Sequence, residues 1–135
     1  MKIYKIAQEQ KIVSFDFDNT IFLLEKDPED DFSYKFDPKD PDIPLGKINQ
    51  KIADLIFNYN SNGYKVICVT SRMAKYKKQV EDVIRENSLP ISEIYCTNGQ
   101  DKVDTLKRLG VLKHYDDDKF QIMELENSGI EGILV

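Results

Sequence analysis

Two pairs of aspartates are the residues of this chain best suited to chemistry. Asp16 and Asp18 lie two positions apart at the end of the apolar run KIVSFDF, and Asp116 and Asp117 follow a second run, VLKHY. Residues two apart on a strand share a side. Two carboxylates about 4 Å apart repel by about 4 kcal/mol at an effective dielectric constant near 20. A hard divalent cation would offset that repulsion, and Mg²⁺ is the usual choice beside a phosphate.

Three further polar residues could act on the same phosphate. Thr70 ends the apolar run YKVICVT and can donate a hydroxyl hydrogen bond to a phosphoryl oxygen, a role for which Ser71 competes. Lys102 opens a helical pattern, where a cation is mildly unfavourable, and could provide a counter-charge for a nucleophile and a phosphate. Taken alone, Thr70 also fits an ordinary strand residue, and Lys102 an ordinary solvated lysine.

The candidate residues follow apolar runs that have the length of buried strands. Strands are expected at residues 11–17, 64–70, 92–97, 111–115 and 132–135. Apolar residues at helical spacing predict helices between them, at 48–61, 73–88, 103–109 and around 122–125. This alternation predicts a three-layer α/β Rossmann-like fold, with a parallel five-stranded sheet and helices on both faces. Ligands bind outside the carboxyl ends of such strands, so the polar residues should meet at one edge.

Residues 21–47 interrupt the alternation and are rich in Asp and Pro. Within them, residues 25–42 contain eight Asp or Glu and three Lys. The segment fits either an acidic, solvated loop or a short hairpin flap over the site, since it leaves the same edge as Asp18. No internal repeat is visible, and we expect residues 1–135 to form a single domain.

Composition limits the class of protein. A chain of 135 residues, 41% of them hydrophobic, can bury one core. Its net charge of −5 disfavours non-specific nucleic-acid binding, which depends on Lys and Arg. We find no apolar stretch of 18 residues and no signal-peptide pattern, and we expect Cys68 and Cys96 to be buried thiols. These features predict a cytoplasmic protein without a membrane partner.

At the candidate residues the chain resembles the haloacid dehalogenase-like (HAD) hydrolase superfamily. FDFDNT matches the first motif, DxDx[TV], and VICVTSR matches the second, a strand ending in Thr or Ser. Lys102 in DKVDTL matches the third motif, and HYDDD matches the fourth. All four motifs occur in family order and span the chain. Asn19 stands where glycine is commonest, and HYDDD leaves Asp117 and Asp118 as alternatives for its second acid.

The resemblance implies a mechanism through an aspartyl-phosphate. Asp16 would attack phosphorus, and Asp18 would protonate the leaving oxygen and then activate water. Thr70 and Lys102 would complete the catalytic set. Mg²⁺ would be held by Asp16, the backbone carbonyl of Asp18, and Asp116 or Asp117.

The same resemblance narrows the reaction and the substrate. An acid at Asp18 favours a phosphatase or a mutase, and mutases need a cap domain for which the insert is too short. This implies a capless phosphatase with an open site, suited to a nucleotide or a nucleic-acid end. TSR before a basic helix is similar to the phosphatase domains of end-repair enzymes. Ser71, Arg72, Lys75 and Lys78 could then bind substrate, although a basic helix face is also commonly just solvated.

Two alternatives of other classes remain. A response-regulator-like phosphoacceptor shares the sheet and the aspartyl-phosphate, but its paired acids follow the first strand and its phosphoacceptor follows the third. Here the third strand ends in Thr97-Asn98, and paired acids come late in the chain, so the motif order argues against it. A catalytically idle binding module of the same fold is the second alternative. The motifs do not predict the oligomeric state.

Overall fold

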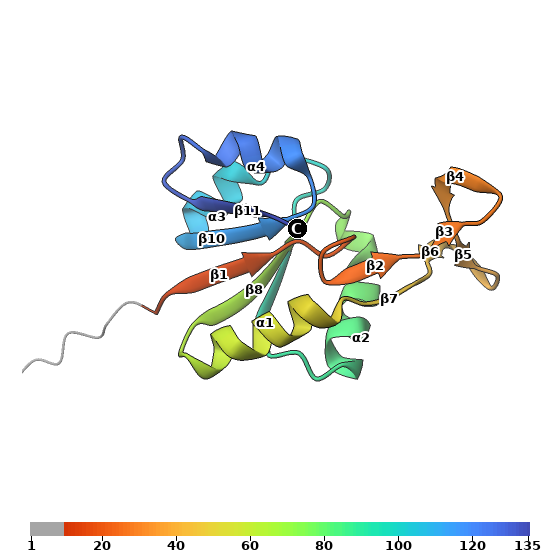
Figure 1. Cartoon of the computed structure of the whole chain (residues 1–135), viewed down its shortest axis with the longest axis horizontal. Helices are drawn as coiled ribbons and strands as arrows, with labels where there is room; N and C mark the ends of the chain where they lie inside the picture. The colour runs from red at the N-terminus through yellow and green to blue at the C-terminus, as the bar shows by residue number, and fades with distance from the viewer. Residues whose placement is uncertain (1–9) are drawn as a thin grey trace, which may run out of the picture.

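The computed structural model describes residues 10–135, which form a layered body and a projecting arm (Figure 1). The body contains a five-stranded sheet in the order β11-β10-β1-β8-β9, with every neighbouring pair parallel. Its strands are β1 (Ile12–Phe15), β8 (Lys65–Thr70), β9 (Glu93–Cys96), β10 (Val111–Asp116) and β11 (Glu131–Leu134). The predicted parallel five-stranded sheet is therefore confirmed.

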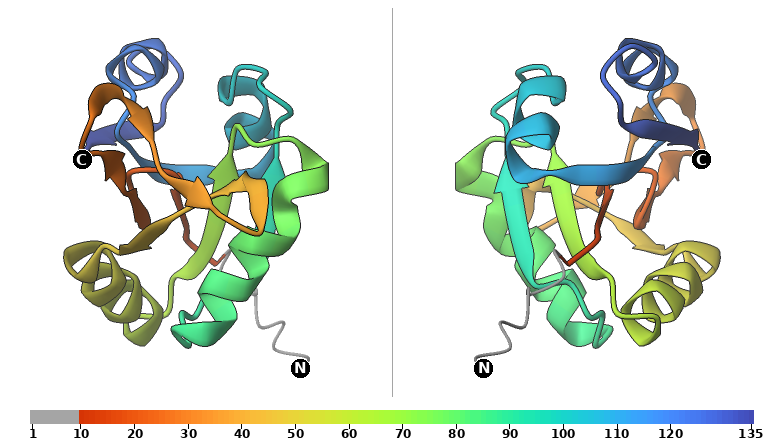
Figure 2. Two further views of the ribbon diagram at one scale, coloured as in Figure 1. Left: turned by 90° about the vertical axis from the view of Figure 1, so that its right-hand side faces the viewer. Right: turned by 90° about the vertical axis from the view of Figure 1, so that its left-hand side faces the viewer.

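Helices cover both faces of the sheet, as expected (Figures 1 and 2). They are α1 (Gln50–Ser61), α2 (Lys77–Glu86), α3 (Val103–Leu109) and α4 (Lys119–Leu125). Helices α1 and α2 lie on one face, and α3 and α4 on the other. Helix α2 begins later than the apolar spacing predicted, because Met73 is extended and a short 3₁₀ turn, η1 (Ala74–Tyr76), precedes the helix.

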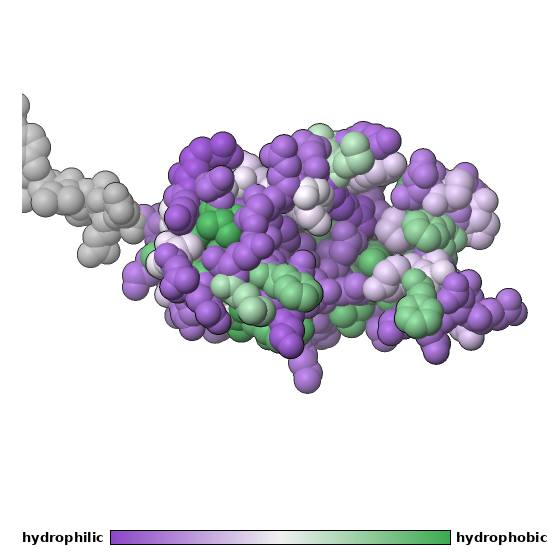
Figure 3. Space-filling model, turned by 90° about the horizontal axis from the view of Figure 1, so that it is seen from above, coloured by the Kyte–Doolittle hydropathy of each residue, from purple (hydrophilic) through white to green (hydrophobic). Residues whose placement is uncertain are grey.

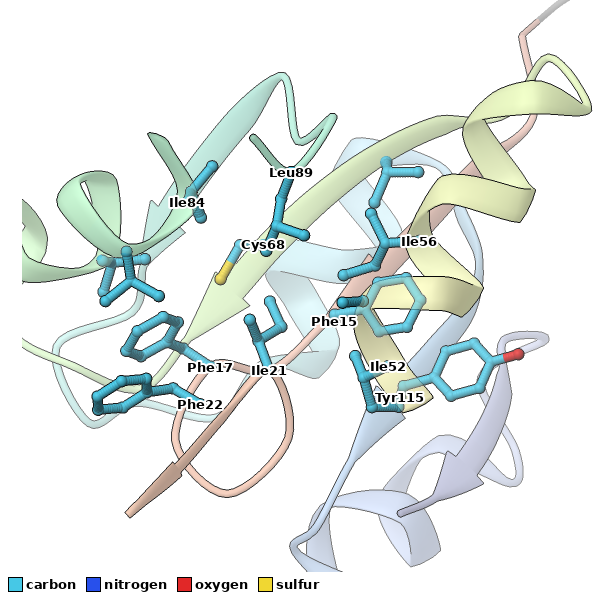
Figure 4. Packing of buried hydrophobic residues seen from close by; sticks show 14 of the residues in the cluster. Phe15, Phe17, Ile21, Phe22, Ile52, Ile56, Cys68, Ile84, Leu89 and Tyr115 are labelled. Atoms are coloured by element: carbon cyan, nitrogen blue, oxygen red, sulfur yellow. The ribbon is translucent and has the colours of Figure 1, made fainter. Parts of the chain in front are cut away.

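Alternation along the central strands explains why their sequences are almost continuously apolar. In β8, Val66 and Cys68 pack in the cluster under α1 and α2, whereas Ile67 and Val69 pack in the cluster under α3 and α4. A strand buried on both faces has no side left for polar residues. Figure 4 shows the first cluster, with Cys68 among the apolar side chains. As predicted, Cys68 is a buried free thiol, while the free Cys96 is only partly buried.

The insert is an ordered arm rather than an irregular loop. Its stem pairs β2 (Phe22–Leu24) with β7 (Gly46–Ile48) in antiparallel register. Two small hairpins lie beyond the stem, formed by β3 (Lys26–Asp27) with β4 (Asp30–Tyr34) and by β5 (Phe36–Asp37) with β6 (Asp40–Pro44). Residues 10–135 thus contain hairpins, and no helical cap domain, at the position of the insert.

A ring of three backbone hydrogen bonds joins the stem to the two hairpins. Lys35 donates its N–H to Glu25 O (2.8 Å), Leu45 donates to Lys35 O (2.9 Å), and Glu25 donates to Leu45 O (2.9 Å). The three residues are ten positions apart. We call this set, Glu25, Lys35 and Leu45, the junction ring. It brings the two ends of the arm back to one point.

The two hairpins repeat each other, which corrects the expectation that the chain has no internal repeat. Residues 25–34 and 35–44 share Asp-Pro at the same turn positions, followed two residues later by Asp. In both turns the first Asp accepts a backbone N–H two residues on, at 2.9 Å in Asp27 and 2.8 Å in Asp37, which is an Asx turn. Three shared residues in ten are too few to reveal the repeat by inspection.

The arm concentrates the charge of the molecule. Residues 25–42 contain eight acidic and three basic side chains, a net charge of −5 that equals the net charge of the whole chain. Phe32 is 98% exposed and Phe36 is 46% exposed among these charges. Figure 3 shows isolated hydrophobic residues on a mainly hydrophilic surface at this end of the molecule. The rest of the chain is electrically balanced.

Among residues 10–135, no helix is both long enough and apolar enough to cross a membrane.

Candidate active site

A pocket of about 660 Å³ opens at the carboxyl edge of the sheet. It is lined by residues from the loop after β1, the loop after β8, the loop before α3, the end of β10 and the start of α4. Six of the predicted site residues line it, namely Asp16, Asp18, Ser71, Lys102, Asp116 and Asp117. The strand ends therefore bring together side chains that are as far apart in the chain as Asp16 and Asp117.

Lys102 is the central cation of this pocket. Its Nζ lies 2.9 Å from Asp16 Oδ1 and 2.7 Å from Asp116 Oδ2, and its side chain is almost fully buried. Burial alone would lower the pKa of Lys102, but the two carboxylates outweigh it and raise that pKa. The lysine is therefore held charged between the two acids, which compensates for its unfavourable place at the start of α3.

The two acids that share Lys102 differ in their proton affinity. Burial raises the pKa of Asp16 to about 8, against the opposing effect of Lys102. Burial also acts to raise the pKa of Asp116, yet hydrogen bonding to His114 and the charge of Lys102 hold it well below its usual range. In the absence of a further cation, Asp116 is thus the ionised partner of Lys102, and Asp16 is the acid that retains a proton near neutral pH.

His114, which was not predicted from the sequence, hydrogen-bonds to Asp116 on the same strand. His114 is fully buried; its Nε2 lies 2.8 Å from Asp116 Oδ2, and its Nδ1 lies 2.6 Å from Ser14 Oγ. An ionised carboxylate only accepts, so Nε2–H donates to Asp116 and Nδ1 accepts from the Ser14 hydroxyl. Burial lowers the pKa of His114, which favours this neutral form. His114 lies two residues before Asp116 on the same strand, so the two side chains share a side, and this spacing could have identified His114 from the sequence.

Three carboxylates form a cluster that fits a divalent cation. Ligand oxygens of Asp16, Asp116 and Asp117 all lie within 4.8 Å of one another. Carboxylate oxygens are the donors that Mg²⁺ prefers, so the residues present fit this ion. Asp118 has another role, because its side chain accepts the N–H groups of Phe120 and Gln121 as the N-cap of α4. The geometry therefore favours Asp117 over Asp118 as the second acid.

Asp18 lies at the pocket beside Arg72 rather than beside Lys102. Arg72 donates Nε to Asp18 Oδ2 (2.8 Å) and Nη2 to Asp18 Oδ1 (2.7 Å), a bidentate pair. The guanidinium also lies over the Phe17 ring, 4.9 Å from its centroid, and donates Nη1 to Gln79 Oε1 (2.7 Å). Gln79 in turn donates to the Pro44 carbonyl of the arm (2.9 Å). Asp18 is thus connected to the arm through two side chains.

The backbone conformation of Asn19 explains why asparagine can replace the glycine that is commonest at this position of the first motif. Its φ is +59°, in the left-handed region where glycine is favoured and asparagine is among the better tolerated alternatives. Its side chain accepts the Leu24 N–H (3.1 Å) and donates to the Tyr34 hydroxyl (3.1 Å). Asparagine therefore fits the tight turn after Asp18 and also holds the arm beside it.

The second-motif hydroxyls occupy different environments. Thr70 is fully buried and its Oγ1 accepts the N–H of Arg72 at 3.2 Å. Ser71 is exposed and lines the pocket. In this structure Ser71 is thus the hydroxyl that faces the pocket, and Thr70 shapes the loop.

The basic residues after β8 do not form the joint phosphate-binding face expected from the sequence. Arg72 is engaged by Asp18, and Lys78 lies 3.4 Å from Asp82. Lys75 and Lys78 line a second groove, between α2 and the acidic β5–β6 hairpin of the arm, instead of the pocket that contains Asp16. Lys75 lies in the short turn η1 and Lys78 in the first turn of α2, and both border the arm.

Comparison with known proteins relates the chain to solved structures. No family model and no curated protein matches it. Two structures of the Pnkp1/Rnl/Hen1 complex, one described as an RNA repair complex, superpose with TM-scores of 0.68 and 0.70 at 21% and 20% identity over 93% of this chain. The chain spans only 42% and 45% of those chains.

Two phosphatase structures have the same core. One is a 3-deoxy-D-manno-octulosonate 8-phosphate (KDO 8-phosphate) phosphatase from Moraxella catarrhalis, in complex with a magnesium ion, a phosphate ion and KDO (TM-score 0.57, 19% identity, 89% of this chain). The other is a putative enzyme of that name from Vibrio cholerae (0.52, 19%, 91%). The chain spans 64% of each. Fold and motifs together assign the chain to the HAD-like fold, in agreement with the sequence resemblance.

Proposed function

We propose that this protein is a Mg²⁺-dependent phosphomonoester hydrolase that acts through an aspartyl-phosphate on Asp16. The observation that carries the proposal is the cluster at the base of the pocket. There, Asp16 is held by Lys102 and lies within 4.8 Å of ligand oxygens of Asp116 and Asp117, while Asp18 lines the same pocket. This set combines a nucleophile, a counter-charge and a second acid in one cavity.

Each side chain has a distinct role in the proposed reaction. A carboxylate oxygen of Asp16 attacks phosphorus, and the bond to the leaving oxygen breaks as Asp18 donates a proton to it. Asp18 then accepts a proton from the water that attacks the aspartyl-phosphate, which regenerates Asp16 and releases phosphate. The Lys102 ammonium and the Ser71 hydroxyl would stabilise phosphoryl oxygens, since both side chains line the pocket.

The bidentate contact of Arg72 with Asp18 has a consequence for this reaction. Both carboxylate oxygens of Asp18 accept guanidinium N–H groups, at 2.8 and 2.7 Å. One of these oxygens has to reach the leaving oxygen of the substrate, so substrate binding has to loosen this contact. Arg72 is then a positioning residue for Asp18 rather than a ligand of a flanking phosphate.

Asp16, Asp116 and Asp117 would hold Mg²⁺, together with the backbone carbonyl of Asp18. When bound, the ion would supply charge neutralisation for the attacking carboxylate and the phosphoryl group. It would also favour the ionised form of Asp16, whose pKa burial otherwise raises to about 8.

We further propose that the substrate is a nucleotide or a phosphorylated nucleic-acid end. Support comes from the likeness to chains of an RNA repair complex and from the arm, which is built of hairpins and contains no helical cap to enclose a small substrate. Because two of the similar structures are named as KDO 8-phosphate phosphatases, a sugar phosphate is the substrate with which nucleotides should be compared.

A substrate panel tests this function. Phosphate release is measured with Mg²⁺ and with excess chelator on nucleoside monophosphates, 3′- and 5′-phosphorylated oligonucleotides, sugar phosphates and acetyl phosphate. We expect turnover with Mg²⁺ only, highest for nucleotides or oligonucleotide ends. Full activity in chelator would refute the metal dependence, and a preference for sugar phosphates would refute the substrate class.

Substitution of the two first-motif acids tests the mechanism. Asp16→Asn should abolish turnover and leave no acid-stable, base-labile phosphoprotein. Asp18→Asn should lower kcat by roughly 10²–10⁴-fold, the usual contribution of general acid–base catalysis. Near-normal activity of Asp16→Asn would mean that another residue is the nucleophile.

A further inference from the structure

One large aromatic side chain stands at the mouth of the catalytic pocket. Phe120, in the first turn of α4, lines this pocket and is 74% exposed. Single exposed hydrophobic residues are common on protein surfaces and need no explanation by themselves. Phe120 differs because it borders the cavity that contains Asp16, where a substrate group would cover it.

The charges at this pocket restrict what can lie against Phe120. Lys102 is the one cation among the described residues that line the pocket, and it is engaged by Asp16 and Asp116. Asp101 and Glu124 line the pocket as well. A second phosphate on the substrate would meet these carboxylates without a counter-charge, within the roughly 8–10 Å over which charges act at physiological salt. An uncharged, flat group suits this wall better.

The neighbouring side chain offers an unused donor. Gln121 lines the pocket, and its Oε1 lies 3.4 Å from the backbone N of Lys102, which donates to it. Within residues 10–135, its Nε2 is buried and has no hydrogen-bond partner. Buried amide donors without a partner are rare, so this one calls for an acceptor that the chain itself does not provide. An oxygen or ring nitrogen of a bound group would be such an acceptor once the Gln121 side chain turns its amide toward the pocket.

We propose that Phe120 and Gln121 form a nucleobase subsite, in which the base of a nucleoside monophosphate stacks on Phe120 while its phosphate lies at Asp16. This inference rests on the proposed function and narrows its substrate to nucleotides with a single phosphate at the reacting end. Stacking on an aromatic side chain tolerates any base, because every base has a π face. The subsite therefore selects for a base without selecting its identity.

A kinetic comparison tests the subsite. We measure kcat/KM for 3′-AMP, 5′-AMP and ADP relative to kcat/KM for acetyl phosphate, which has no base. Phe120→Ala and Phe120→Leu should lower the ratio for the better monophosphate by about 5- to 100-fold, mainly through KM, because stacking is lost. Phe120→Tyr should retain the ratio. The unsubstituted protein should also prefer that monophosphate to ADP.

Met123→Ala is the matched control, because Met123 lies on the same helix, is 53% exposed and does not line the pocket. It should leave the ratio as in the unsubstituted protein. If Phe120→Ala and the unsubstituted protein gave the same ratio of kcat/KM values, the proposed subsite would be wrong. Loss of acetyl phosphate turnover in every form would instead refute the proposed function.

A binding measurement keeps the two failures distinct. In Asp18→Asn protein with Mg²⁺, saturation transferred from protein protons to the adenine H2 and H8 of AMP reports contact with the base. We expect this signal to be present, to disappear with added Phe120→Ala and to persist with added Met123→Ala. Its absence, or its persistence without Phe120, would overturn the inference whether or not the protein hydrolyses phosphates.

Discussion

At the scale of single residues, the charge balance around Lys102 dominates the site. One buried lysine faces two buried carboxylates, and a third acid, Asp117, lies beside them. Burial raises the pKa of Asp16 to about 8, so the metal-free site prefers to keep a proton there. The proposed attack by Asp16 requires its ionised form, whereas the metal-free protein is more stable with Asp16 protonated.

This conflict predicts a pH dependence of stability in chelator. Folding raises the pKa of Asp16 from the ordinary aspartate value of 3.8 to about 8. A carboxyl whose pKa is raised on folding stabilises fully below the unfolded value, and this contribution is lost as pH rises through the folded value. The melting temperature in EDTA should thus fall between about pH 4 and about pH 8, the range between the unfolded and folded pKa values of Asp16. Asp16→Asn should flatten that fall, and Mg²⁺ should oppose it; a melting temperature that rises over this range would contradict the shift.

The buried His114 should tune metal affinity through Asp116. Hydrogen-bonding partners of metal ligands typically contribute 10–100-fold to affinity. We expect His114→Gln to weaken Mg²⁺ binding by about that factor, as measured by calorimetric titration. Ser14→Ala should weaken it less, because it removes only the hydroxyl that accompanies His114 Nδ1. The melting temperature in chelator checks that both variants fold. Unchanged Mg²⁺ affinity in both variants would show that His114 does not affect metal binding.

At the scale of elements, the β2–β7 stem sets where the arm leaves the body. Gly46 of β7 packs so tightly that a Cβ would lie 2.5 Å from the Leu23 carbonyl oxygen and 2.6 Å from the Phe22 ring. Phe22 belongs to the main core and stacks on Phe17, with centroids 5.3 Å apart. The stem is therefore continuous with the packing under Asp18.

Gly46→Ala should disrupt this stem. Overpacking a close contact typically costs about 1–3 kcal/mol, and here backbone is one of the clashing groups. Gly132→Ala is the control, since its Cβ would meet the Ile122 side chain at 3.2 Å, where a small shift suffices. We expect a clearly larger drop in melting temperature for Gly46→Ala. Equal drops would mean that the stem is free to move away from the core.

Elements also show how far the sequence could predict the fold. The five strands and four helices follow from alternation of apolar runs, and the polar strand ends follow from their placement. The junction ring could not be predicted, because backbone hydrogen bonds carry it and leave no side-chain pattern. The pairing of Arg72 with Asp18 was equally hidden, since it joins residues 54 positions apart through loop geometry.

At the scale of the whole molecule, charge is divided unequally between arm and body. The acidic arm lies beside the edge of the sheet that contains the candidate site, where Asn19 contacts Tyr34 of the arm. A polyanionic substrate, such as the proposed nucleic-acid end, would meet repulsion if it approached from the arm side, whereas from the α4 side it would not meet the arm first. The arm would then bias the direction of approach as well as the strength of binding.

Removal of the arm tests this bias. Replacing residues 26–44 by two glycines should preserve the body, because Glu25 and Leu45 are already joined by a 2.9 Å backbone hydrogen bond. The variant should show a lower KM for a phosphorylated oligonucleotide at low salt, and the difference should shrink at high salt as charges are screened. The KM for acetyl phosphate should change much less on removal of the arm, because this substrate is small and carries at most two negative charges. A KM for the oligonucleotide that rises would show that the arm attracts this substrate.

The junction ring gives the arm a modular construction. Each ten-residue unit starts and finishes at the ring, so an added or lost unit leaves the entry and exit of the chain where they were. A tandem duplication in the gene could then have produced the second hairpin from the first without disturbing the body. In this way the arm could lengthen or shorten by one hairpin at a time, while the residues of the candidate site stay unchanged.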